Sequence, residues 1–178
     1  MILYHGTSAS RLQSILKEGL VPNKPGNWKG KLASRWGYVY LSAAFPALYA
    51  TYASREGDQG VILEVDVAGI DLYPDEDFLW SAGLKKRPKN LDRWRHVAMD
   101  SLNHMGTVAV KGVAPDRILR HREIGNDFFM ASRIGADLSV SPTAYKVLGP
   151  QYRKRIEVFM DGGYDAVQIQ QAKDEWGV

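Results

Sequence analysis

Two short stretches decide the fold, Leu3–Thr7 (LYHGT) and Gly37–Ser42 (GYVYLS). Each is an apolar, strand-forming run that carries a polar group unsuited to a core, His5 in the first and Tyr40 in the second. A helix-like segment and a loop-like segment separate them. We therefore expect two neighbouring strands, with the functional groups where they meet.

Outward from these stretches, the sequence alternates short strands with helices. Ser8–Leu20 predicts a capped helix with one apolar stripe, closed by Gly19. The other expected elements are a cationic loop over residues 21–35, a helix over Ser42–Ala53, strands over Val61–Val67, Thr107–Val110 and Arg117–Arg122, a helix over Asp92–His104, two short helices near Thr143–Leu148 and Gln151–Met160, and a strand within Gly162–Gln170. In the strand at Val61–Val67, Glu64 is expected to face water or a cleft.

The order of these elements predicts an α+β protein with a mixed sheet or a split β-sandwich and peripheral helices. The chain has 178 residues, of which 45% are hydrophobic, enough for one core. We expect residues 1–124 to form that core. Residues 125–178 are expected to form a C-terminal helical extension packed on it, within one domain.

The composition excludes several classes of site. The chain has no cysteine, which removes disulfides, thiolate metal sites and a cysteine nucleophile. Neither a leader-like start nor an apolar run of membrane-spanning length is present, so we expect a cytoplasmic protein that makes no membrane contact. The histidines lack the spacing of a helical metal pair, and no metal site is expected.

Two charged segments each allow two interpretations. The adjacent carboxylates of Asp75, Glu76 and Asp77 could bind a divalent cation, but without a glycine-spaced loop a solvated turn is the preferred interpretation. The basic residues around Trp94 could follow a phosphate backbone, although a solvated helix face is again preferred. The net charge of +3 is only a mild basic bias.

Four stretches in order resemble one family. They are Tyr4–Thr7 (YHGT), Glu18–Pro22 (EGLVP), Gly37–Ser42 with Ala47–Ala50 (ALYA), and Gly60–Val65 (GVILEV). Together they resemble ADP-ribosyltransferases of the branch with a His-Tyr-Glu signature, shared by diphtheria-type toxins and poly(ADP-ribose) polymerases and, more remotely, by RNA 2'-phosphotransferases. The resemblance implies the ADP-ribosyltransferase-like split β-sandwich and NAD as the substrate, with no metal.

The resemblance also implies roles for individual residues. His5 would hydrogen-bond a ribose of NAD, the backbone of Gly6 would bind the nicotinamide amide, and Tyr40 would stack on the nicotinamide ring. Supporting cofactor-binding roles fall to Thr7, Ser42, Tyr49 or Tyr52, and to the cations Arg11, Lys29, Lys31 and Arg35 toward the pyrophosphate.

The third signature residue, usually a glutamate, is where this sequence departs from the family. Thr107 stands at the corresponding position of its strand, and a threonine cannot act as a general base near neutral pH. Three alternatives remain open. The acid comes from elsewhere, such as Glu64; the last strand supplies Gln168 or Gln170; or transfer proceeds without a glutamate, which is the alternative we favour. Loss of activity would be a further outcome.

These features predict an NAD-dependent mono-ADP-ribosyltransferase that modifies a macromolecule, either a protein or a nucleic acid. The missing acid argues against synthesis of long polymers, and the setting could be that of a toxin or an effector. Two alternatives stay open: an RNA 2'-phosphotransferase-like enzyme, whose arginine set is not evident here, and a catalytically inactive binding module that keeps the fold.

Overall fold

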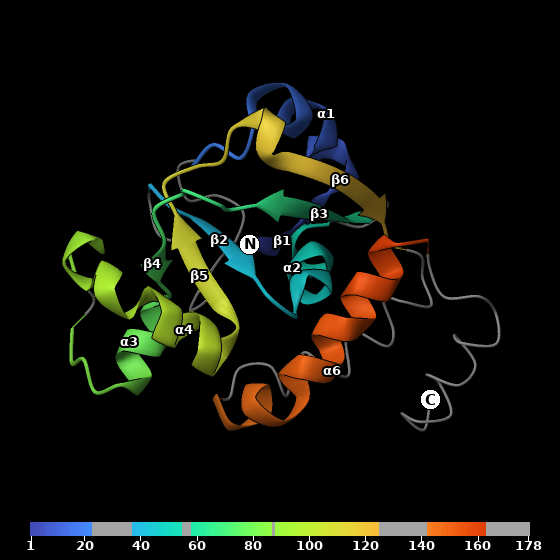
Figure 1. Cartoon of the computed structure of the whole chain (residues 1–178). Coiled ribbons are helices and arrows are strands. Elements are labelled where there is room, and N and C mark those ends of the chain that lie inside the picture. The colour runs from blue at the N-terminus through green and yellow to red at the C-terminus, as the bar shows by residue number, and fades with distance from the viewer. Residues whose placement is uncertain (23–36, 55–57, 87, 125–141, 163–178) are drawn as a thin grey trace.

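The computed structural model describes residues 1–22, 37–54, 58–86, 88–124 and 142–162. Six described strands form one sheet in the order β4-β5-β2-β1-β3-β6 (Figure 1). Their bounds are β1 Ile2–Ser8, β2 Val39–Ser42, β3 Gly60–Asp66, β4 Tyr73–Pro74, β5 Thr107–Val110 and β6 Ile118–Glu123. Every pairing between these strands is antiparallel, so the α+β class is confirmed and the sheet is not mixed.

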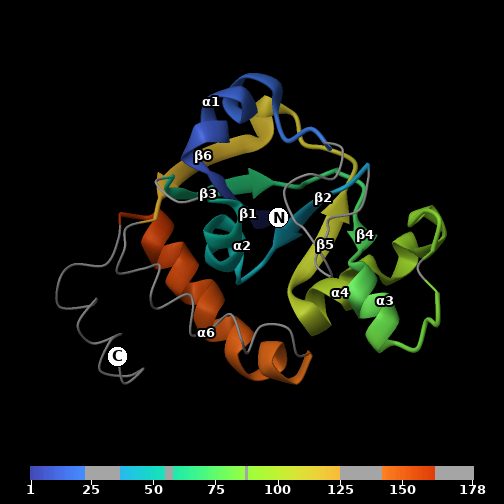
Figure 2. The same cartoon turned by 180° about the vertical axis from the view of Figure 1, so that it is seen from behind.

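The helices lie on both sides of the sheet. They are α1 Ala9–Glu18, α2 Pro46–Ala53, α3 Glu76–Ser81, α4 Ala98–Met105 and α6 Pro142–Met160, with short 3-10 helices η1 Asp92–Val97 and η2 Pro115–Arg117. Both views show α1 above β3 and β6, α2 and α6 below the centre of the sheet, and α3 with α4 beside β4 and β5 (Figures 1 and 2).

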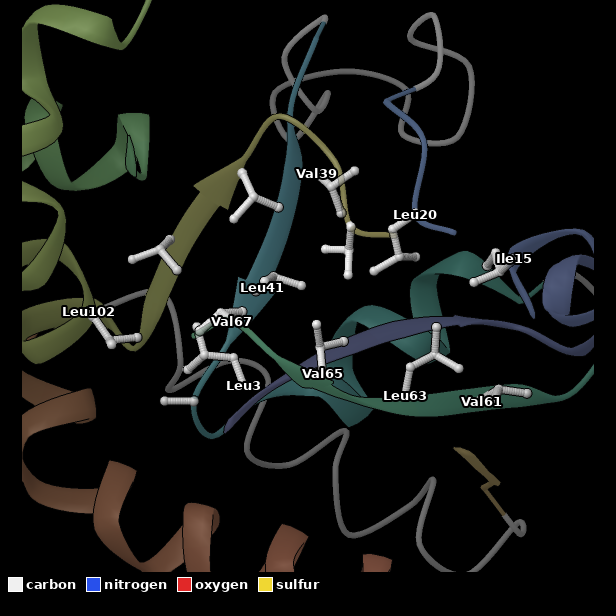
Figure 3. Packing of buried hydrophobic residues seen from close by; sticks show 14 of the residues in the cluster. Leu3, Ile15, Leu20, Val39, Leu41, Val61, Leu63, Val65, Val67 and Leu102 are labelled. Carbon is white, nitrogen blue, oxygen red and sulfur yellow. The ribbon is translucent and has the colours of Figure 1, made fainter. Parts of the chain in front are cut away.

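One face of the sheet packs against α1. Leu3, Leu63 and Val65 are fully buried there, together with residues of β2 and β5 (Figure 3). Leu12 and Ile15 of α1 complete this cluster, which confirms the apolar stripe expected for that helix. At its end Gly19 has a φ of 82°, a conformation that residues with a side chain rarely adopt.

The opposite face of β1 and β3 packs against α2 and α6. Its buried cluster joins residues of the two strands with Ala47 and Ala50 of α2 and with Ile156 and Phe159 of α6. A methyl group at Gly6 would clash with backbone atoms of α2, so glycine is required for this helix to lie directly on β1. A helix from the expected C-terminal extension therefore contributes to the same core as β1.

Several local expectations are corrected. Residues 142–160 form one helix containing Pro150, where two short helices were expected. Glu64 is buried, not solvent-facing: it is only 8% exposed and its carboxylate binds the guanidinium of Arg120 at 2.8 Å. Strand β4 and helix α3 were not expected, and the predicted strand at residues 162–170 lies almost wholly outside the described residues.

Candidate functional site

The sheet opens between β1 and β2, the two strands singled out by the sequence. Their pairing consists of one residue pair, Tyr4 opposite Ser42, whereas β1 pairs with β3 along its whole length from Ile2 to Ser8. The sheet is therefore divided into the halves β4-β5-β2 and β1-β3-β6, joined at that pair. We call the opening beside His5–Ser8 the split.

The backbone of Gly6 faces this split. Ala9 N donates to Gln59 O at 2.8 Å and Val67 N donates to Met1 O at 2.9 Å, which shows that odd-numbered residues of β1 direct their backbone groups toward β3. Alternate residues of an antiparallel strand point to opposite neighbours. The N–H and C=O of Gly6 consequently point toward β2, where the ladder gives this residue no partner.

His5 spans the split with its side chain. Its Nδ1 lies 3.0 Å from the backbone oxygen of Tyr40, and because a carbonyl only accepts, Nδ1 carries the proton. Burial lowers the pKa of the imidazole, and the nearby Arg11 guanidinium lowers it further, against the effect of the Tyr40 carbonyl. At neutral pH His5 is thus uncharged, and Nε2 is the acceptor nitrogen of its ring.

The two rings of the predicted site do not stack on each other. His5 lies opposite Leu63, on the face covered by α1, near Arg11. Tyr40 lies opposite Ala109 and projects to the other face, toward α3. The structure therefore places His5 and Arg11 on one face of the sheet and the Tyr40 ring on the other.

The Tyr40 hydroxyl forms a hydrogen bond with the carboxylate of Glu76, a residue that the sequence did not indicate for the site. It donates to Glu76 Oε2 at 3.3 Å, and Glu76 is only 8% exposed. This overturns the solvated-turn interpretation of the acidic segment for Glu76, although Asp77 is exposed. Within the described residues, no group of three or more acidic or histidine side chains could hold a metal ion.

Thr107, the position of the missing acid, lies beside the start of α3. The buried Ser101 hydroxyl donates to Thr107 O at 2.8 Å and accepts from Asp75 N at 2.9 Å, which ties the two backbones together. Burial raises the pKa of Asp75 to about 6, while the Asp77 N–H and the Thr107 hydroxyl favour its charged form. The Thr107 hydroxyl itself is buried beside this carboxylate.

The two tyrosines of α2 that were candidates for stacking on nicotinamide, Tyr49 and Tyr52, differ in burial. Tyr49 is half-buried, and burial together with the charges of Asp75 and Asp77 raises the pKa of its phenol, which places it across from the start of α3. Tyr52 is 54% exposed. Of the two, Tyr49 is the one on the side of α3, toward which the Tyr40 ring also projects.

The remaining predicted residues divide into three groups. Thr7 is buried in β1, and the buried Ser42 hydroxyl accepts from Ala44 N and Phe45 N, which fixes the turn into α2. Glu64 is committed to Arg120, away from the split. Lys29, Lys31, Arg35, Gln168 and Gln170 lie outside the described residues.

The basic segment around Trp94 is a mixed surface. Arg95 pairs with Asp71 and lies over the ring of Tyr73, while Trp94 is partly buried against the cluster beneath. Lys85, Lys86, Lys89 and Arg93 are exposed. Most of the segment is therefore the solvated face that its charge pattern favoured.

Sequence reasoning missed Glu76 and Asp75 as site residues. Asp75 caps α3 by accepting from Asp77 N at 2.9 Å, and Glu76 follows as the first helical residue, turned inward. The available signal was an acidic residue just before the apolar pattern of Phe78–Leu79, but it marks a helix start and does not say which carboxylate is buried.

No family model matches the chain, and no curated protein matches it significantly. In the described part of the chain, none of the helices has the length and apolar character needed to cross a bilayer.

Proposed function

We propose that this protein is an NAD-dependent mono-ADP-ribosyltransferase acting on a macromolecular acceptor, with an ADP-ribosyltransferase-like split β-sandwich. The observation that carries the proposal is the split itself, with the backbone N–H and C=O of Gly6 facing it and His5 bonded across it to Tyr40. A backbone donor and acceptor side by side complement the carboxamide of nicotinamide, which offers one of each.

The arrangement of side chains suits two parts of NAD, the nicotinamide ring and the pyrophosphate. Tyr40 and Tyr49 supply aromatic surface on the α2–α3 side, where a nicotinamide ring could stack. On the α1 side, Arg11 supplies a cation near His5, as a pyrophosphate requires. A dinucleotide lying through the split would meet both groups at once.

The chemistry that such a site supports is glycosyl transfer. The bond between the ribose C1' and the nicotinamide nitrogen breaks, and its electron pair neutralises that nitrogen. A lone pair of the acceptor then forms the new bond to C1'. Positioning and electrostatic stabilisation of the cationic sugar are what the protein must supply.

The test is incubation of the purified protein with NAD labelled in its adenylate half and a cell lysate, followed by detection of labelled macromolecules and of released nicotinamide. His5→Ala and Tyr40→Ala should each abolish both signals while the proteins remain folded by circular dichroism. His121→Ala removes an exposed histidine of β6 and serves as the matched control, expected to be fully active. A folded wild type without transfer or nicotinamide release would contradict the proposal.

The inactive-module alternative is weakened by Glu76. A buried carboxylate held by the Tyr40 hydroxyl is the type of group that a transfer reaction needs and that simple recognition of NAD does not. Calorimetry with NAD separates the two, because binding without turnover would support the module.

A further inference from the structure

Resting on the proposed function, we propose that Glu76 is the carboxylate of the transfer site, acting from helix α3 in place of an acid at Thr107. The sequence placed the acid on β5 or left it out. The structure brings a buried carboxylate to the Tyr40 hydroxyl from a different element, helix α3.

The first step of the argument is the contact between Glu76 and Tyr40. The phenol donates to Oε2 at 3.3 Å, so this carboxylate oxygen lies at the tip of the ring proposed to stack on nicotinamide. The hydroxyl is the atom of the Tyr40 side chain farthest from strand β2. Glu76 therefore lies at the outer end of this side chain, on the face of the sheet that Tyr40 shares with Ala109 of β5.

The second step is the position of α3 relative to Thr107. Ser101 hydrogen-bonds the backbones of Asp75 and Thr107 at once, through a side chain that is fully buried. This bridge holds the residue preceding Glu76 against the β5 position. The start of α3, and with it Glu76, is thereby fixed beside the first residue of β5.

The third step is the Thr107 hydroxyl. Thr107 is 3% exposed, and its hydroxyl lies beside the carboxylate of Asp75, whose charged form it favours. The place next to Thr107 is therefore occupied by Asp75, and Glu76 is the carboxylate turned toward the Tyr40 hydroxyl.

The role assigned to Glu76 follows from its charge and its place. The leaving nicotinamide takes the electron pair of the glycosidic bond, and the attacking acceptor must lose a proton as its bond to C1' forms. Glu76 accepts that proton and then returns it to water. Asp75 is less suited to this role because its carboxylate already caps α3 at Asp77 N and is engaged by the Thr107 hydroxyl.

The experiment measures nicotinamide release from NAD in water by the full chain and, separately, NAD affinity by calorimetry. Glu76→Gln keeps the shape and removes the charge. We expect kcat to fall about 100-fold or more, as loss of a general base typically does, with the Kd of NAD within about threefold of wild type. Glu123→Gln, an exposed glutamate of β6, is the matched control and should not change kcat.

Chemical rescue separates a catalytic role from a structural one. In Glu76→Ala, added formate should raise turnover at least about tenfold, because this small carboxylate can enter the space that the glutamate side chain leaves. Chloride at the same concentration should not raise turnover. If Glu76→Ala or Glu76→Gln does not fold, Glu76→Asp is used instead. It keeps the charge but shortens the side chain by one methylene group, and it should again lower kcat while the Kd of NAD stays unchanged.

The outcomes distinguish this inference from the function on which it rests. Wild-type turnover that survives in folded Glu76→Gln overturns the role of Glu76 alone. A parallel loss of turnover and NAD affinity also overturns it, since it marks Glu76 as a binding group. A folded wild type that neither binds NAD nor releases nicotinamide overturns the proposed function and this inference together.

Discussion

The imidazole Nδ1 of His5 lies 3.0 Å from the backbone carbonyl oxygen of Tyr40, across the opening between two strands that pair only at Tyr4 and Ser42. One side chain thus replaces the backbone bonds that a continuous sheet would have at this point. This contact requires the neutral Nδ1–H tautomer or a fully protonated ring.

The lowered pKa of His5 predicts a pH-dependent stability. Burial holds the folded-state pKa below its ordinary value of 6.5, so the unfolded chain binds a proton first as the pH falls. The free energy of unfolding of wild type should therefore decrease relative to His5→Asn between pH 7 and pH 5. Urea titrations at several pH values measure this difference, and a constant difference would contradict the prediction.

Asp75 should show the opposite dependence. Its pKa is raised to about 6 in the folded protein, mainly by burial, so the folded state binds the proton first and gains stability as the pH falls. Asn also caps helices well. Asp75→Asn should thus stabilise the protein by about 1–2 kcal/mol at pH 8, because Asp75 is partly exposed and water screens part of the cost of its charge. The gain should vanish near pH 4, where Asp75 is protonated in the folded protein. Equal gains at both pH values would contradict this account.

Gly6→Ala should disrupt folding. The added methyl group would meet the Pro46 carbonyl and the Ala50 backbone nitrogen, and neither can move without lifting α2 from β1. We expect a loss of more than about 3 kcal/mol or failure to fold, as for a strongly overpacked site. Gly69→Ala, where the methyl group meets nothing but φ is 76°, should cost only about 1 kcal/mol in chemical denaturation.

Arg120→Gln should be strongly destabilising. Arg120 binds the buried Glu64 and Asp161, and its Nη1 donates to Met160 O at the end of α6, so its removal leaves a buried carboxylate without this cation. We expect a loss of about 3 kcal/mol. Its control is Arg153→Gln, which breaks an exposed pair with Glu157 and should cost at most about 0.5 kcal/mol. Similar losses in the two variants would argue against a buried pair.

Thr107→Val separates stability from turnover. Because the Thr107 hydroxyl favours the charged form of the buried Asp75 carboxylate, its replacement by an isosteric methyl group should lower the melting temperature slightly at pH 8 and less at pH 5. If a ribose hydroxyl also contacts it, nicotinamide release should fall further than stability, and Thr107→Ser should retain most of the activity. Full activity in Thr107→Val would remove this hydroxyl from the site.

The local pattern of apolar residues predicted most of the helices and strands, and it predicted the ends of some of them. The strand at Thr107–Val110 was predicted with its observed bounds, and α1 was predicted to within a few residues because its apolar stripe and closing glycine are local signals. Strand β4 has only two residues and α3 only six, too few for a periodic pattern. Two short helices were predicted near residues 143–148 and 151–160, yet α6 runs through Pro150 without a break, because its packing against the sheet outweighs one missing hydrogen bond.

The sequence by itself determined the α+β class, the two strands that carry His5 and Tyr40, and the glycine directly after His5. Strand propensity and glycine placement act over a few residues, so local sequence is enough to reveal them. Only the tertiary structure decided that these strands part after a single pair and that Gly6 faces the opening. It also decided that the buried acid near Tyr40 is Glu76 and not Glu64. Burial of a carboxylate depends on partners distant in the chain, Tyr40 for Glu76 and Arg120 for Glu64, and no local pattern encodes that choice.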